Sequence, residues 1–357
     1  MVKIFRQTRQ TLINDEKVTK YLLYAIGEII LVVIGILIAL QLDTAKELKD
    51  NKEQIKGILF NIAINLDESA MQIAEVLDYI EENDSLANII LKKELSAADY
   101  VGDIWTNSFI GLTRRSMEVV HYNSTAYERL MGNIEIIPDE FDEMIKLLHH
   151  VYNQEIPIAM GVEREVKTFL SSIEDELRIS QAWYSMTEPE HQKRAVDYYL
   201  NDPIYLNNVY RLKGHLTHLT VHLYQLRSQI NLAYNEMYWD LFSETPFAEN
   251  ITKIEPTNLE ELDEYTGVYV LSGKMNSQSP DTLRLVISDG MLMDETYEQA
   301  IIKNDTDRFI PTVSIGMDIY LDFYRTEQGE INTLEVSFPH LDKRDSIVTE
   351  LFYKISE

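Results

Sequence analysis

Residues 21–42 read YLLYAIGEIILVVIGILIALQL and form the apolar run on which the rest of the organisation depends. At roughly 1.5 Å per residue, a helix of this length reaches about 33 Å, which is enough to cross a bilayer core of about 30 Å. A cleaved signal peptide typically has an apolar region of about 7–15 residues followed by a small-residue cleavage site. Here Leu40, Gln41, Leu42 and Asp43 follow instead. The pattern therefore predicts an uncleaved, single-pass transmembrane helix over residues 21–42.

Basic residues on the two sides of this run predict its orientation. Residues 1–20 carry five of them, Lys3, Arg6, Arg9, Lys17 and Lys20, whereas Lys46, Lys49, Lys52 and Lys56 follow the run. The positive-inside rule counts Lys and Arg near the ends of the span, so the bias toward a cytoplasmic N-terminus is five against four. We expect residues 1–20 to be a cytoplasmic or interfacial segment, with the remaining chain on the periplasmic side of a bacterial inner membrane.

Glu28 is the acidic residue inside the predicted span. An ionised carboxylate at the bilayer centre costs about 2.5–3.5 kcal/mol on insertion scales, so such a group is protonated, reaches the interface or faces a partner. A carboxylate at the near interface or in a helix dimer is one interpretation, and a functional intramembrane carboxylate is the other. Gly35 and Ala39 form a small-xxx-small pair that favours close helix contact.

The run from Lys20 to Gln41 resembles the opening of a family of uncharacterised bacterial single-pass envelope proteins. These proteins have a basic N-terminus, a YLLYAIGEI-type span with the embedded acid, and a mostly helical domain. The matching positions include Phe5, Arg6, Tyr24, Gly27 and Glu28. Many relatives continue with an Asn-Asn-Trp-like segment after the span, whereas this chain continues with Leu42, Asp43 and Thr44. The resemblance implies topology and implies no chemistry.

Charge and composition limit the functions of the whole chain. The 357 residues include 32 Lys and Arg against 59 Asp and Glu, which gives a net charge of −27. Because a polyanion repels phosphate backbones, nucleic-acid binding is not expected. With 45% hydrophobic residues the chain can form packed cores, and the absence of cysteine excludes disulfides, thiolate metal sites and thiol nucleophiles.

Apolar residues recur at helical spacing through residues 43–246, which predicts a helical stalk and an antiparallel bundle. Three expected core stripes are Leu48, Ile55, Leu59, Ile62, Leu66, Ile73, Val76 and Ile80; Val162, Val166, Phe169, Ile173 and Leu177; and Leu212, Leu216, Leu219, Leu223, Leu226 and Ile230. A further helix is expected from near Pro138 to a stop before Pro157, and Thr187 with Glu190 fits a capping box. The tract from 101 to 133 has no clear period.

Three histidines, His215, His218 and His222, lie on the last of these helices at positions i, i+3 and i+7. Zinc binding would require their imidazoles to converge with a fourth ligand or water. Each histidine immediately precedes a stripe leucine, so we expect a flanking role beside the seam and no metal. Metal binding and pH sensing remain the alternatives.

After a linker at residues 247–258, the period changes from helical to two, which predicts an α+β chain ending in an antiparallel β domain at 259–357. We expect five to seven strands, with hairpins at Asp289-Gly290 and Gly329. Ile347, Leu351, Phe352 and Ile355 are expected to form a closing helix.

The pattern Tyr265-x-Gly-x-Tyr269, Asp289-Gly290, Phe323 and Gly329 resembles the small lipocalin-like β domain appended to penicillin-recognising serine hydrolases. The resemblance implies a half barrel or barrel. In those proteins a separate domain with a Ser-x-x-Lys nucleophile performs the chemistry, and no Ser-x-x-Lys is present here.

No common catalytic or phosphate-binding motif is present in the sequence, so we expect no catalytic residue and no cofactor. A metal-dependent enzyme is a minor alternative. The sequence favours a membrane-anchored binding or scaffold protein of the bacterial envelope that contacts lipid and engages a protein or small ligand. The expected partner is a second copy of the chain or another envelope protein. The alternative is an accessory subunit of a membrane-energised or channel complex that uses Glu28.

Overall fold

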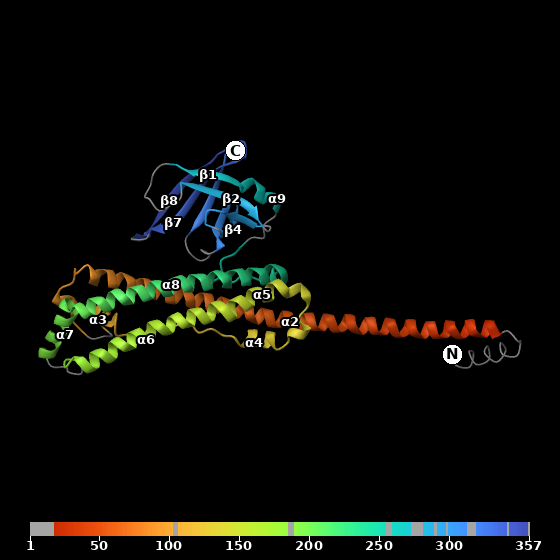
Figure 1. The fold of residues 1–357 in the computed structure, drawn as a ribbon, viewed down its shortest axis with the longest axis horizontal. Coiled ribbons are helices and arrows are strands. Elements are labelled where there is room, and N and C mark those ends of the chain that lie inside the picture. Colours follow the sequence, from red (N-terminus) through yellow and green to blue (C-terminus); the bar gives the residue numbers. More distant parts are fainter. Residues whose placement is uncertain are drawn as a thin grey trace. The chain divides into compact units, whose positions relative to one another are not determined.

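The fold is α+β in a computed structural model that describes residues 18–102, 106–184, 189–254, 259–272, 281–288, 291–297, 299–312, 319–340 and 343–355 (Figure 1). The chain divides into two compact units. One unit is Met1–Gly57 with Asn133–Glu140, and the other is Ile58–Gly132 with Phe141–Glu357.

The helix α2 (Val18–Leu91) is a single element of 74 residues that begins before the apolar run and continues far beyond it. Seven of the eight predicted stripe residues, from Ile55 to Ile80, are buried. Leu48 is the exception, since 59% of it is exposed. The predicted stripe is therefore confirmed from Ile55 onward.

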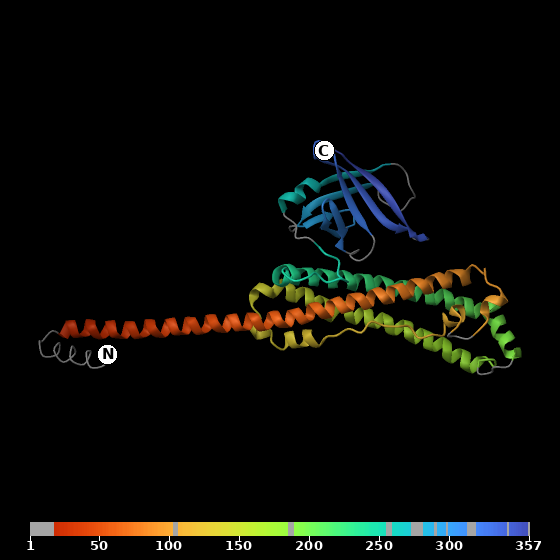
Figure 2. The ribbon, with the colours of Figure 1, turned by 180° about the vertical axis from the view of Figure 1, so that it is seen from behind.

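The helices that follow form the bundle predicted from the periodicity. In the second unit, α6 and α8 pack along each other, and α5 packs on α8 (Figures 1 and 2). Every predicted stripe residue of α6 and α8 is buried. Lys213 of α8 reaches Asp84 of α2 with an Nζ–Oδ1 distance of 3.0 Å, which ties these two helices together. The helices after α2 are α3 (Ser108–Gly111), α4 (Thr125–Met131), α5 (Asp142–His150), α6 (Ile156–Ser180), α7 (Pro189–Asn201) and α8 (Pro203–Met237).

The predicted stop before Pro157 is wrong, because the chain stays helical from α5 through a π turn, η4 (Val151–Glu155), into α6. Pro157 lacks a backbone N–H and lies just after this π turn, where the N–H of Ile156 bonds to the carbonyl of Val151. The tract at 101–133 contains the short helices α3 and α4 and an extended stretch between them. Asn107 caps α3 by accepting hydrogen bonds from the N–H groups of Phe109 and Ile110.

The C-terminal part is a closed antiparallel barrel in which each strand pairs with its neighbours in chain order. It fits a lipocalin-like domain, because lipocalins are up-and-down barrels of eight strands. Its strands are β1 (Gly267–Leu271), β2 (Thr282–Ser288), β3 (Met291–Asp294), β4 (Gln299–Asp305), β5 (Arg308–Pro311), β6 (Tyr320–Arg325), β7 (Ile331–His340) and β8 (Lys343–Ile355). The expected number of five to seven strands was too low, since the described residues contain eight.

Closure depends on β1 and β8, which pair from Val268 opposite Ile355 to Leu271 opposite Phe352. The β2–β3 register places Ser288 opposite Met291, which agrees with the predicted two-residue hairpin, although residues 289 and 290 lie outside the described residues. Gly329 has a φ of +86° in the turn between β6 and β7, as expected for a glycine there. Figure 1 shows the barrel strands wrapping into a closed sheet.

Aromatic rings fill the barrel interior. Tyr265, Phe309 and Phe323 meet edge to face, with ring centroids 4.6–5.3 Å apart. Tyr265 comes from the short turn η6 (Asp263–Tyr265), which follows α9 (Leu259–Leu262) and contributes to the same core. Edge-to-face rings stabilise a core beyond the area that they bury.

The predicted closing helix at the C-terminus is wrong, because these residues form β8. Phe352 is buried in the barrel, whereas Leu351, Tyr353 and Ile355 are exposed. This alternation has a period of two, which is that of a strand. The apolar residues at 347, 351, 352 and 355 fit a helical spacing equally well, and only pairing with β1 and β7 selects the strand.

Several sequence predictions fall wholly or partly on residues outside the described part of the chain. Besides the hairpin turn at residues 289 and 290, these include the basic segment at residues 1–20, of which only the start of α2 is described, and Thr187 of the proposed capping box. The linker predicted at 247–258 is described as far as residue 254.

Two isoleucines on barrel strands provide a matched test of the core. Ile301 on β4 is 3% exposed, and Ile347 on β8 is 64% exposed. We expect Ile301→Ala to destabilise the barrel by about 2–5 kcal/mol through a lost contact and a cavity. We expect Ile347→Ala to change stability by less than about 0.5 kcal/mol. Thermal unfolding of the full chain, followed by near-UV circular dichroism, measures both. Equal effects would contradict the strand register.

Candidate functional site

The apolar run of α2 has no buried segment. None of its most apolar 18-residue window is buried against the described residues, and the helix is long and apolar enough to cross a membrane. A signal sequence near the N-terminus can be equally long and apolar. In a water-soluble fold such a run would be covered, because large exposed apolar patches mark contacts with partners or lipid.

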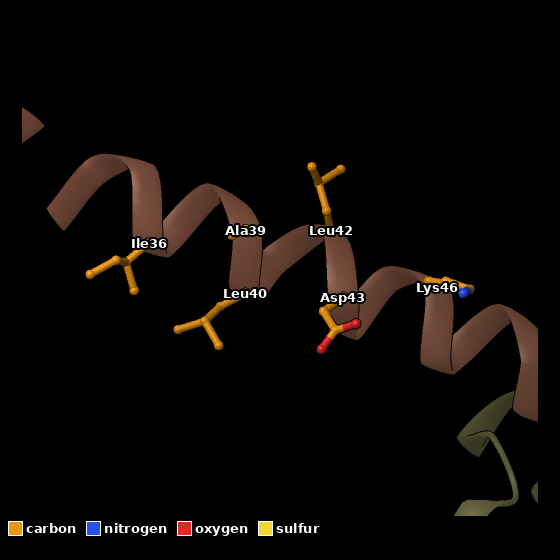
Figure 3. A pocket seen from close by; sticks show the side chains of 6 residues that line it. All are labelled: Ile36, Ala39, Leu40, Leu42, Asp43 and Lys46. Carbon is orange, nitrogen blue, oxygen red and sulfur yellow. The ribbon is translucent and has the colours of Figure 1, made fainter. Parts of the chain in front are cut away.

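Glu28 and the small residues Gly35 and Ala39 lie on this helix, and Glu28 is exposed on it. A side chain at Gly35 would meet nothing within 4 Å. Figure 3 shows Ala39 beside Ile36, Leu40 and Leu42 on the helix surface. The depression that these residues line with Asp43 and Lys46 is formed by α2 alone, so it is an open helix face. Helix contact at Gly35 and Ala39 stays a prediction.

The structure brings together two of the three candidate histidines. The Nε2 atoms of His218 and His222 are 3.1 Å apart. His215 instead packs on Phe169 of α6, with ring centroids 4.8 Å apart. Among the described residues, no group of three or more His, Asp or Glu side chains is placed to hold a metal ion. The expected flanking role fits His215.

A buried carboxylate that no sequence motif marks lies on α6. Glu163 is 5% exposed, and its Oε1 accepts a hydrogen bond of 3.3 Å from the N–H of Val120. This contact fixes the extended stretch before α4 against the helix. Burial raises the pKa of the Glu163 carboxyl above its usual value. In the sequence, Glu163 is marked only by its place beside Val162 of a core stripe. Charged residues commonly occupy such positions at the edge of a stripe.

One end of the barrel is closed by an ion network. The guanidinium of Arg325 donates to Asp307 at 2.8–3.1 Å and to Glu264 at 2.6 Å, and Tyr265 donates its hydroxyl to Asp307 at 2.7 Å. Hydrogen bonding from Arg325 lowers the pKa of the Asp307 carboxyl. These bonds link η6 to β6 and to the turn before β5, so the network holds the end of the barrel together.

The outer face of the barrel has an apolar strip on its two closing strands. Leu351, Tyr353 and Ile355 are exposed on β8. Val268 pairs with Ile355 and Val270 with Tyr353 across the β1–β8 ladder, so these five residues form one continuous surface, here named the β1–β8 strip. No sequence pattern marks this strip, because the apolar spacing at residues 347–355 fits a helix.

No family model, no curated protein and no solved structure matches this chain. The resemblances to single-pass envelope proteins and to the lipocalin-like domain therefore depend on the residues that carry them, and the family membership stays a prediction.

Glu163 makes stability depend on pH in a predictable direction. Its pKa is raised in the folded state, so the folded protein binds this proton more tightly than the unfolded chain. The contribution to stability is present below the unfolded value of 4.5 and is lost as pH rises through the folded pKa. We expect Glu163→Gln to raise the thermal midpoint at pH 7.5, with the gain disappearing near pH 4.5.

Glu165 is the matched control, because it is exposed on the same helix two residues away. Glu165→Gln should leave the midpoint unchanged at both pH values. A lower midpoint of Glu163→Gln at pH 7.5 would mean that the ionised carboxylate stabilises the fold.

Proposed function

We propose that this chain is a non-enzymatic binding or scaffold protein of the bacterial envelope, anchored in the inner membrane by residues 21–42. The observation that carries the proposal is the composition of α2. One unbroken helix contains both an apolar run with no buried residue in its most apolar window and the stripe that is buried in the helical body. A membrane anchor requires exposed apolar residues, and a folded body requires buried ones.

In the proposed topology, the short N-terminus lies in the cytoplasm, and the bundle and barrel lie in the periplasm. Five bases before the run against four lysines after it support this orientation. Continuity of α2 supports an uncleaved anchor over a signal sequence, since a cleavage site directly after the run would lie inside a continuous helix.

The barrel favours a protein partner over a small ligand. Its interior is filled by side chains, including Tyr269, Phe309 and Phe352, all at most 1% exposed. A closed barrel has no free edge strand, so a partner strand cannot extend the sheet. Side chains on the outer face must then make the contacts, and the β1–β8 strip offers aromatic and aliphatic ones.

A second candidate function depends on Glu28. Its carboxylate lies among exposed apolar residues of α2, including Ile26, Ile29 and Ile30. Acidic residues in such surroundings are commonly part of a proton or ion pathway. In this alternative, the chain is an accessory subunit of a membrane-energised or channel complex.

Two tyrosines of equal exposure on the barrel test the proposed contact surface. Tyr353 in the β1–β8 strip is 48% exposed, and Tyr324 on β6 is 47% exposed. A photo-cross-linking residue at position 353 of the full chain, expressed in cells, should capture one envelope protein. The same residue at position 324, beside Asp322 and Thr333, should capture none.

With the cross-linking residue placed at Leu351, Tyr353→Glu should lower the yield about tenfold or more, because an unpaired carboxylate buried in the contact costs more than about 1.4 kcal/mol. Tyr324→Glu should leave that yield unchanged. Equal capture at positions 353 and 324, or no captured envelope protein, would remove the strip as the contact surface.

Membrane extraction of the wild type and of Glu28→Gln tests the anchor. Gln removes the charge while keeping the size, so the variant and the wild type should both remain in carbonate-washed membranes at the full mass of 41.5 kDa. Release into the wash, or a mass shortened by the first 42 residues, would contradict the anchor.

A protonophore then separates the two functions. As an anchor, α2 should give the same cross-links before and after collapse of the proton gradient. If Glu28 couples to protons, collapse should change the cross-links of the wild type and leave those of Glu28→Gln unchanged.

A further inference from the structure

His218 and His222 lie on one face of α8, separated by a single helical turn. Such i, i+4 spacing places two side chains next to each other on a helix surface. The ring centroids are 4.8 Å apart, and the two Nε2 atoms approach to 3.1 Å. His218 is exposed and His222 is half-buried, so an ion from solvent can reach the pair.

The separation of the two nitrogens matches the bite of a chelated ion. With metal–nitrogen bonds of about 2.05 Å, two ligand nitrogens are separated by about 2.9 Å at an angle of 90° and by about 3.3 Å at the tetrahedral angle. The observed 3.1 Å falls between these two values. The backbone therefore already places the two Nε2 atoms at the separation that one chelated ion requires.

An ion bound by both Nε2 atoms requires the proton of each neutral imidazole to lie on Nδ1. The Nδ1 atom of His222 is enclosed by protein and makes no hydrogen bond to the described residues. Its Nε2 is thus the nitrogen that remains for an exchangeable ligand. In the absence of metal, one imidazole donates its Nε2 proton to the other Nε2, which accounts for the same short distance.

We propose that His218 and His222 form a bidentate site for a late divalent transition-metal ion, with water in the remaining positions. Imidazole nitrogen suits copper, nickel and zinc, and affinity rises to copper along the first-row series. This is a two-histidine site, so it does not need the three-residue constellation that is missing from the described part of the chain.

The site binds metal and has no apparatus for hydrolysis. In zinc peptidases with His at i and i+4, a glutamate follows the first histidine and acts as the general base. Here Leu219 follows His218, and it is fully buried in the core. A bound ion would instead cross-link one turn of α8 and stabilise the folded state over the unfolded one. The inference is independent of the proposed anchor and partner, because both ligands belong to a single helix.

Calorimetric titration of the untagged, full-length chain in detergent with Cu²⁺ tests the site. We expect one Cu²⁺ bound per chain, and a Kd that rises about tenfold or more in His218→Ala and in His222→Ala, since loss of even an outer-shell partner costs 10–100-fold. The double variant should lose the site. Electron paramagnetic resonance of the Cu²⁺-loaded wild type should show nitrogen hyperfine splitting that the double variant lacks.

His215→Ala is the matched control, because His215 lies on the same helix with its ring on Phe169. Its Kd for Cu²⁺ should equal that of the wild type. Far-UV circular dichroism checks that each variant is folded. If His222→Ala loses helix content, the Kd of His218→Ala tests the site, because His218 is exposed. Equal binding by the wild type and the double variant overturns the proposal, as does an equal loss in His215→Ala.

Discussion

Burial of the apolar stripe on α2 is the constraint on which the rest of the structure depends. From Ile55 to Ile80 this stripe is buried. Toward its N-terminus the same helix is apolar, and its most apolar window is not buried. A backbone whose polar groups are all bonded within the helix can pass from an aqueous to an apolar environment without leaving any of them unsatisfied. One element can therefore belong to a folded body at one end and to lipid at the other.

The barrel meets a different constraint, which is that the backbone N–H and C=O groups of its edge strands need hydrogen-bond partners. Pairing of β1 with β8 leaves no open strand, so backbone contacts with another chain are blocked and only side chains can recognise a partner. The filled interior has the same consequence for small ligands, because the rings of Tyr265, Phe309 and Phe323 meet edge to face there and occupy the space. Arg325 and Asp307 hold the end of that barrel with charged groups rather than apolar ones.

The candidate site residues were partly predictable from the sequence. Glu28 stood out in the sequence because a carboxylate is rare in an apolar run, and the spacing of the histidines singled out His218 and His222 together with His215. The approach of the two imidazoles depends on rotamers, which spacing alone does not determine. Glu163 gave almost no signal, because a charged residue beside a stripe is normally solvated, and its burial comes from the extended segment that packs over α6 at Val120.

The sequence by itself determined the position of the apolar run, the helical stripes of α6 and α8, and the change to strands after residue 246. Each of these depends on a local period, which neighbouring residues set without help from distant ones. The tertiary structure decided that residues 343–355 are a strand, that the sheet closes, and that Tyr353 lies on an exposed strip. These features require pairing between β1 and β8, which are about 80 residues apart in the chain, and no local period encodes a contact over that distance.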